Sequence, residues 1–309
     1  MNLKLYFIWI LIYFSTSIYA SLIEPIPTSL DLDMKKVILG KKLFFDTILS
    51  KDSNVSCASC HDLLNGGDDG LKYSVGIDGA IGVINAPTVY NSTFNFRQFW
   101  DGRVKDLKEQ VIEPIENPVE MGHSIEAIIS DLKNNSKYVE EFSNIYKDGI
   151  TEDTISDTIA EFEKSLITPN APFDKYLKGD KTAINKIAKR GYKLFIDKGC
   201  IVCHNGINVG GNLYNKFGIY KDINSSNFGR YNITKREEDR YVFKVPSLRN
   251  VSLTSPYMHD GRFTTLKKVV KFMTNYQLGR DINSSDIEAI VEFLNTLTGE
   301  LPQIVKEKP

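Results

Sequence analysis

Two short stretches of this chain combine cysteine and histidine at a spacing that can hold a metal-containing group. Residues 57–61 read CASCH and residues 200–204 read CIVCH, and these motifs use all four cysteines of the chain. In C-x-x-C-H, the two thiols can form thioethers with haem vinyl groups while the histidine binds the iron from one face. The sequence therefore predicts two covalently attached haem c groups. Their predicted ligands and attachment residues are Cys57, Cys60, His61, Cys200, Cys203 and His204.

Other uses of paired cysteines compete with this interpretation. Cysteines of an exported protein ordinarily form disulfides, and zinc ribbons also use paired C-x-x-C motifs. Neither use requires a histidine directly after each pair, and a redox-active dithiol usually occurs once. Two complete copies of the motif therefore favour haem over zinc or disulfides.

The first twenty residues have the build of a secretory signal peptide. Lys4 precedes an apolar run from Leu5 to Phe14, and small and polar residues follow up to Ala20. Such a run is shorter than the roughly 20 apolar residues of a membrane-spanning helix, so cleavage after Ala20 is favoured over an uncleaved anchor. We therefore expect a periplasmic protein without a membrane span after cleavage.

The composition is that of a soluble globular protein rather than a nucleic-acid binder. Hydrophobic residues make up 42% and charged residues 25%, and the formal net charge of −1 leaves no basic excess to neutralise phosphates. The length of 309 residues favours two domains over one. The two cysteine motifs lie 143 residues apart, which is about the length of one small domain.

The elements that position the motifs are predicted to be helices. Apolar residues recur at steps of three and four, and no long alternating pattern indicates a strand. The segments with this helical spacing are 125–132, 155–166, 266–276 and 287–297. A short β ribbon is expected at the end of NITKREEDRYVFKV (232–245). The predicted fold class is mostly α, with two cytochrome-c-like haem domains and long irregular loops.

The predicted domain junction lies in TPNAPFDKYLKGD (168–180), which is rich in Pro, Asn, Asp and Gly. The predicted parts are a signal peptide (1–20), a first haem domain (21–170), a second haem domain (171–298) and a C-terminal tail (299–309).

Longer stretches around these motifs resemble the bacterial di-haem cytochrome c peroxidases, whose superfamily also contains the MauG-type enzymes. In chain order the stretches read LGKKLFFDTILSKDSNVSCASCH, INAPTVYNSTFNFRQFWDGR, EQVIEPIENPVEMG, GCIVCHNGINVGGNLYNKFG and VPSLRNVSLTSPYMHDGRFTTL. The resemblance implies an oxidoreductase that reduces hydrogen peroxide to water with electrons from a small cytochrome c or copper protein. It also implies a peroxidatic haem in the first domain and an electron-transfer haem in the second.

For the second haem, the resemblance implies that Met273 binds the iron opposite His204. Met/His ligation raises the reduction potential, as an electron acceptor requires. The alternative is a core role, since methionine on an apolar helical stripe usually fills space. MauG-type enzymes carry tyrosine at this position, so Met273 favours a peroxidase. His259, in YMHDG, is expected near the same haem as a hydrogen-bond partner of a propionate.

For the first haem, the resemblance places Glu120 and Gln110 on the side opposite His61. A carboxylate there can move a proton between the two peroxide oxygens, and an amide can orient bound peroxide. Without the resemblance, both residues would be assigned to the surface. Trp100, in QFWDGR, is implied between the two haems, where it helps electrons cross; packing in the core is its other interpretation.

The resemblance further implies a calcium ion between the domains and a homodimer. The implied calcium ligands are the side-chain oxygen of Asn85 and the backbone carbonyls of Thr254 and Pro256, and calcium prefers such oxygen ligands. The sequence contains no acidic cage for calcium, so this expectation depends on the resemblance alone.

One position departs from the family pattern. Many members carry a histidine in a stretch like S-I-G-H-G, and it caps the peroxidatic iron until the other haem is reduced. Here the stretch reads YSVGIDGAIG, and Ile77 takes that position. We therefore expect an open distal site and no requirement for reductive activation. His123 is the other candidate cap, although a role outside the iron's ligands is favoured.

Two other functions fit part of the pattern. The first is a MauG-like di-haem oxidase that acts on a protein substrate. The second is a non-catalytic di-haem electron carrier, in which both irons would have six ligands.

Overall fold

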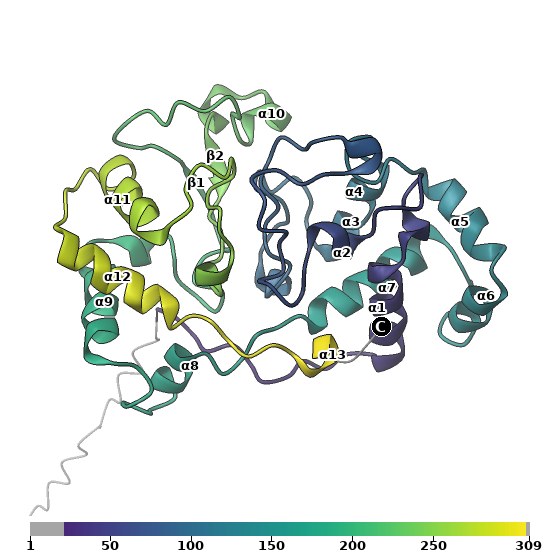
Figure 1. The fold of residues 1–309 in the computed structure, drawn as a ribbon, viewed down its shortest axis with the longest axis horizontal. Helices are drawn as coiled ribbons and strands as arrows, with labels where there is room; N and C mark the ends of the chain where they lie inside the picture. The colour runs from purple at the N-terminus through teal and green to yellow at the C-terminus, as the bar shows by residue number, and fades with distance from the viewer. Residues whose placement is uncertain (1–21, 307–309) are drawn as a thin grey trace, which may run out of the picture.

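The computed structural model describes residues 22–306, which form two mostly helical lobes joined by long loops (Figure 1). The predicted signal peptide, residues 1–20, lies outside the described residues. The prediction of a mostly α fold is confirmed, since strands are limited to one two-stranded ribbon in the described part of the chain. Within residues 22–306, every helix is too short or too polar to cross a bilayer.

The first lobe contains seven helices among the described residues. They are α1 (Met34–Phe45), α2 (Cys57–Cys60), α3 (Leu107–Gln110), α4 (Ile112–Glu116), α5 (Ile125–Lys133), α6 (Ser136–Ser143) and α7 (Glu152–Ser165). Helices α1 and α7 pack against each other at Gly40, where a Cβ would overlap the carbonyl oxygen of Thr158. Glycine is therefore required at this crossing despite its low helix propensity.

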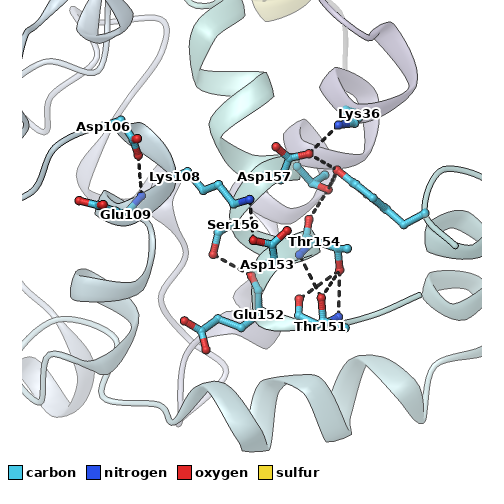
Figure 2. Close-up of polar contacts among 12 residues, drawn as sticks. Lys36, Asp106, Lys108, Glu109, Thr151, Glu152, Asp153, Thr154, Ser156 and Asp157 are labelled. Atoms are coloured by element: carbon cyan, nitrogen blue, oxygen red, sulfur yellow. Dashed lines mark hydrogen bonds and ion pairs between the residues drawn. The ribbon is translucent and has the colours of Figure 1, made fainter. Parts of the chain in front are cut away.

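Polar contacts hold α3 against the start of α7 (Figure 2). Thr151 caps α7, because its hydroxyl accepts from the backbone N–H of Thr154 at 3.2 Å while the Thr154 hydroxyl accepts from Thr151 N–H at 2.9 Å. Lys108 of α3 lies 2.6 Å from the carboxylate of Asp153 on α7. The cap fixes the start of α7, and the ion pair joins α3 to it.

The second lobe repeats this use of a glycine. Its helices are α8 (Pro172–Leu177), α9 (Lys186–Asp197), α10 (Tyr231–Thr234), α11 (Leu266–Tyr276) and α12 (Ser284–Asn295). Helices α9 and α12 pack at Gly191, where a Cβ would overlap the carbonyl oxygen of Ala289. The predicted ribbon is confirmed, since β1 (Tyr214–Lys216) pairs antiparallel with β2 (Val242–Lys244).

Each end of the described chain packs on the lobe that is distant in sequence. Ile23 belongs to the hydrophobic core of the second lobe, and the carbonyl of Glu24 accepts from the Arg249 guanidinium at 2.7 Å. Arg249 also forms a fully buried ion pair with Asp174 at 2.6 Å. At the other end, α13 (Gln303–Lys306) lies beside α1 (Figure 1), and Ile304 packs into the first lobe.

A buried carboxyl group lies inside the first lobe. Glu163 of α7 is buried, one of its side-chain oxygens has no hydrogen-bond partner, and burial raises its pKa to about 8. Its charge also helps raise the pKa of the neighbouring Cys57 thiol. Because the pKa of Glu163 is higher in the folded than in the unfolded state, the free energy of unfolding falls as the pH rises from about 5 to about 8.

Glu163→Gln is expected to remove this loss of stability. At pH 9 the variant should be more stable than the wild type by up to roughly 5 kcal/mol, because the amide stays neutral when buried. At pH 4 the two proteins should be nearly equal. Urea unfolding of the holoprotein across this pH range measures the effect, and Glu140→Gln, at an exposed position of α6, is the control. An equal difference at both pH values would contradict the prediction.

Candidate haem-binding sites

The first cysteine motif forms a single helical turn. Ser56 precedes α2, and its backbone N–H donates to the Ser59 hydroxyl at 3.0 Å, which fixes the start of the turn. Residues three apart in a helix lie on one side, so Cys57 and Cys60 point in similar directions. None of the four cysteines pairs with another in a disulfide.

His61 ends this turn in a state that suits iron binding. Its Nδ1 lies 3.1 Å from the carbonyl oxygen of Gly67, and donating a hydrogen bond there leaves Nε2 free for a metal. Burial lowers the pKa of His61, so the imidazole is neutral near pH 7. Gly66 and Gly67 both have positive φ, which lets the loop turn back toward the ring. Cys57, Cys60 and His61 therefore fit a covalent haem with one histidine ligand.

Glu120 lies close to this motif. Its charge contributes to a raised pKa of the Cys60 thiol, mainly caused by burial. Burial also raises the pKa of Glu120 itself, while the Arg103 guanidinium and a 2.7 Å hydrogen bond from the Asn117 amide act in the opposite direction. Asn117 is three residues before Glu120, and sequence reasoning missed it because an asparagine before proline usually indicates only a turn.

Ile77 lies directly beside the backbone of Glu120. Its N–H donates to the Glu120 carbonyl at 2.9 Å, and its side chain is 7% exposed and belongs to the first lobe's core. A Cβ at Gly122 would overlap the end of the Ile77 side chain, so the two loops are in close contact. Where the family pattern has a histidine, this chain therefore places the aliphatic side chain of Ile77 next to Glu120.

Gln110, expected near the first haem, and His123, the other candidate cap, form no hydrogen bond with the Glu120 side chain. Gln110 is the last residue of α3, and within residues 22–306 its side chain makes no hydrogen bond. His123 points instead toward α5, where its Nε2 lies 3.3 Å from a carboxylate oxygen of Asp131.

The second motif opens into an apolar cavity. The residues expected at the second haem all line it, namely Cys200, Cys203, His204, Met273 and His259, and Trp100 lines it as well. Apolar side chains of α9, α11 and α12 form much of the wall: Phe195, Val269, Val270, Ile290 and Leu294. The structure therefore brings a histidine and a methionine to one apolar cavity, as a Met/His-ligated haem requires.

His204 is closely surrounded by backbone. Burial lowers its pKa to about 4, although the carbonyls of Val209 and Pro246 act in the opposite direction. Within residues 22–306, the buried Nδ1 makes no hydrogen bond of good geometry. A Cβ at Gly210 would overlap the Pro246 carbonyl, so glycine at φ 129° is required beside the imidazole. The neutral ring fits an iron ligand.

Trp100 connects this cavity to the first lobe. Its indole N–H donates to the Asn85 carbonyl at 2.9 Å, and its ring lies 6.2 Å from the His259 ring. His259 is buried, stacks on Phe243 and lies 3.0 Å from the Ser225 hydroxyl. Lys244 also lines the cavity, and burial lowers its pKa to about 8. Sequence reasoning missed this buried cation, which a haem propionate could neutralise, because its segment predicted only a ribbon.

The expected calcium ligands lie on loops that meet. The Asn85 amide donates to the carbonyls of Leu71 and Lys72 at 2.9 and 3.4 Å, which leaves its side-chain oxygen without a hydrogen bond among the described residues. The loop 66–72 approaches the loop 253–256, which contains Thr254 and Pro256. Two buried carboxylate oxygens without partners, on Asp68 and Asp69, lie on the first of these loops.

Sequence reasoning did not identify Asp68 or Asp69, although an acidic pair after Gly-Gly is a recognisable signal. Burial raises the pKa of Asp68 to about 7, which a nearby cation would reverse. Within residues 22–306, no three His, Cys, Asp or Glu side chains converge as a metal cage. Calcium sites also use carbonyl and amide oxygens.

Both lobes match known families. Residues 34–182 match the family described as di-haem cytochrome c peroxidase, and residues 188–298 match the family described as cytochrome c. The chain is 47% identical to the cytochrome c551 peroxidase of Nitrosomonas europaea over 91% of its own length and 85% of the relative's. It is 46% identical to the cytochrome c peroxidase Ccp of Escherichia coli over 93% of its length, and it spans 63% of that relative.

A solved structure has the same fold. It is a MauG-like protein associated with microbial copper homeostasis, and it superposes with a TM-score of 0.80 over 93% of this chain and 95% of that one, at 25% identity. The prediction of two cytochrome-c-like domains is confirmed by these matches. They also support haem c as the group held by the two cysteine motifs.

Proposed function

The chain belongs to the di-haem cytochrome c peroxidase family of haem oxidoreductases, and we propose that it reduces hydrogen peroxide to water with electrons from a small periplasmic donor protein. The observation that carries this proposal is the difference between the two sites. Met273 and His204 line one cavity, whereas the Glu120 carboxyl group lies near Cys60 of the other motif, and Ile77 bonds to the Glu120 backbone. One site therefore suits electron storage and the other suits substrate.

Cys57, Cys60 and His61 would hold one haem c and Cys200, Cys203 and His204 the other; the first would supply an iron for peroxide and the second an iron for electron transfer. Each peroxide takes up two electrons and two protons and yields two waters. Two donor molecules each lose one electron in the same cycle.

The residues near the first motif handle the proton. Glu120 is proposed to accept a proton from one peroxide oxygen and return it to the other, which is then released as water. Burial raises its pKa, which makes it a better base than an exposed carboxylate, and Asn117 holds its orientation. Gln110 is proposed to orient the substrate by hydrogen bonding.

Residues of the second lobe hold and route the electrons. Met273 and His204 would both bind the iron of the second haem, and His259 would hydrogen-bond to one of its propionates. Trp100 is proposed to connect the two haems, which its position between the second cavity and the Asn85 backbone supports. We assign the peroxidatic domain to residues 21–170, the electron-transfer domain to residues 171–298 and a tail to residues 299–309.

Coupled turnover tests this function. Holoprotein mixed with peroxide and a reduced small cytochrome c or copper protein should oxidise two donor molecules per peroxide consumed. The reaction should start from the fully oxidised protein, without prior reduction. A protein with two six-ligand irons and no reaction with peroxide would instead be an electron carrier.

We further propose a calcium ion held by the side-chain oxygen of Asn85 and the carbonyls of Thr254 and Pro256, and a homodimer exported to the periplasm. The support for calcium is the free oxygen of Asn85 and the unpartnered carboxylate oxygens of Asp68 and Asp69. These groups are costly to bury without a partner.

Removal of calcium by a chelator is expected to lower the melting temperature of the holoprotein by on the order of 5–10 °C, since a ligand that binds only the folded state stabilises it. In Asn85→Leu the chelator should have almost no effect. Differential scanning calorimetry with and without calcium measures both, and the exposed Asn54→Leu should behave like the wild type. A wild-type melting temperature that is the same with and without calcium would contradict this site.

A further inference from the structure

The near-neutral net charge of this chain hides a strong separation of charge. Residues 21–170 contain 14 Lys and Arg against 25 Asp and Glu, whereas residues 171–298 contain 21 Lys and Arg against 12 Asp and Glu. The first domain therefore carries a net charge of −11 and the second a net charge of +9. A molecule with this asymmetry orients a charged partner before contact.

Part of the positive charge surrounds the mouth of the second cavity. Gln277 and Leu278, just after α11, line the cavity. The Gln277 side chain donates to the Lys216 carbonyl at 2.8 Å and accepts from Gly218 N–H at 2.9 Å. These bonds fix β1 and the loop that follows it against the end of α11, so Lys216 lies exposed at the cavity's rim.

The same helix end holds the next residues of the loop. Tyr220 N–H donates to the Tyr276 carbonyl at 3.0 Å, and the Lys221 ammonium lies 5.7 Å from the centre of the Tyr276 ring. Arg280 lies two residues after the cavity-lining Leu278, and its guanidinium donates to the carbonyl of Asp197, at the end of α9, at 3.3 Å. We call Lys216, Ile219, Tyr220, Lys221 and Arg280 the α11-end surface.

This surface combines free positive charge with exposed apolar side chains. Ile219 is 52% exposed and Tyr220 is 65% exposed. Within residues 22–306, no carboxylate lies within 4.0 Å of the cationic groups of Lys216, Lys221 or Arg280, although the exposed Asp222 and Asp281 are close in sequence. Uncompensated cations beside an apolar patch are typical of a surface that binds a charged partner transiently.

We propose that the α11-end surface docks an acidic electron-donor protein, one whose own redox centre is surrounded by Asp and Glu. The proposal rests on the proposed function and specifies the sign of charge on its partner. Each encounter oxidises the donor by one electron and reduces the second site by one. The electron enters at the cavity mouth, between Lys216 and Arg280, and the apolar patch excludes water from the contact.

The ionic-strength dependence of electron transfer tests the sign of the charge on the donor protein. Reduced plastocyanin serves as an acidic probe and mitochondrial cytochrome c as a basic probe, each with holoprotein and peroxide. The second-order rate constant for the acidic probe should fall roughly tenfold or more between low and high salt, and the basic probe should show no such fall. A faster reaction with the basic probe at low salt would overturn the proposal.

Charge reversal locates the surface. The double variant Lys216→Glu, Lys221→Glu should lose roughly tenfold or more of its rate with plastocyanin at low salt and little at high salt. Lys186 is exposed at the start of α9, whereas the second cysteine motif follows the end of that helix. Lys186→Glu and Lys186→Ala should therefore each retain most of the rate with plastocyanin. Equal losses in the Lys186→Glu and double variants would assign the effect to overall charge and overturn this surface.

Hydroquinone, a small neutral reductant, separates this proposal from the proposed function. All variants should reduce peroxide with hydroquinone at the wild-type rate, and failure of the wild type there would count against peroxidase activity itself. The surface could instead bind an anionic membrane. In that case the wild type would bind anionic vesicles and the double variant would not, while both would react with plastocyanin at the same rate. That result would overturn the proposed donor.

Discussion

Glu120→Gln is expected to slow peroxide reduction by roughly 10²–10⁴-fold, the usual contribution of a positioned acid–base group. Glutamine preserves the size of the side chain and can still bond to Asn117, but it cannot accept and return a proton. The loss should appear in the second-order rate constant for peroxide, measured by stopped flow with the fully oxidised holoprotein. Reduction of the second haem by a donor should be unchanged.

Glu116→Gln is the matched control, because Glu116 is exposed at the end of α4, four residues before Glu120. It should retain nearly the full rate. A Glu120→Gln variant within threefold of the wild type would remove Glu120 from the chemistry.

The pH profile gives a second readout for Glu120. Burial raises its pKa, and the carboxylate form is needed to accept a proton, so the rate should fall as the pH drops through a value above that of an ordinary glutamate. The acid limb should disappear in Glu120→Gln. Loss of the bond from Asn117 in Asn117→Leu should move the limb to higher pH, because that bond favours the ionised form.

Ile77→His is expected to make peroxide turnover depend on prior reduction. An imidazole at this position, beside Glu120, restores the residue with which many family members cap the first iron. If the cap is closed 99% of the time, the reaction of the oxidised protein with peroxide slows about 100-fold. One-electron reduction of the second haem should then restore the rate.

The outcome for Ile77→His is read from absorption or electron paramagnetic resonance spectra of the oxidised protein together with peroxide kinetics. Ile81→His introduces the same side chain at a 65% exposed position of the same loop, and it should leave the spectra and the peroxide kinetics unchanged. Because Ile77 belongs to a buried core, haem content and melting temperature must be compared as well. A correctly folded Ile77→His variant that reacts at the wild-type rate would show that residue 77 does not reach the iron.

The sequence predicted the helices whose apolar stripe is continuous, and their polar ends less well. The 155–166 and 287–297 segments correspond to α7 and α12, which each begin three residues earlier. In both cases the first turn is polar and is fixed by a capping side chain, from Thr151 and Asn283, rather than by apolar packing.

Two long helices, α1 and α9, were not predicted, and each contains a glycine in its middle. Glycine weakens an isolated helix, so local preference does not explain its place there. The reason lies in the partner helix: Gly40 and Gly191 allow α7 and α12 to approach closely. Such long-range contacts are absent from any local reading of the chain.

Some residues of the site could be predicted from the sequence alone, and others could not. The C-x-x-C-H motifs carry their chemistry in local spacing, so the haem attachment residues follow from sequence alone. Met273 and Trp100 required the resemblance, and the structure brings both to the cavity of His204. Gln110 remains a prediction from resemblance, and Asn117, Lys244 and Asp68 emerged only from burial and hydrogen bonding.

The crossed chain ends have a consequence for maturation. Ribosomes make the N-terminus first, yet Ile23 and Glu24 must wait for Asp174 and Arg249, and the first lobe stays incomplete until Ile304 has been made. Both thiol pairs are thus synthesised before either half can finish folding, which leaves an interval for attachment of the porphyrins. A fragment that stops near residue 170 would lack α13, which packs on the core of the first lobe. We expect haem to be attached poorly to such a fragment.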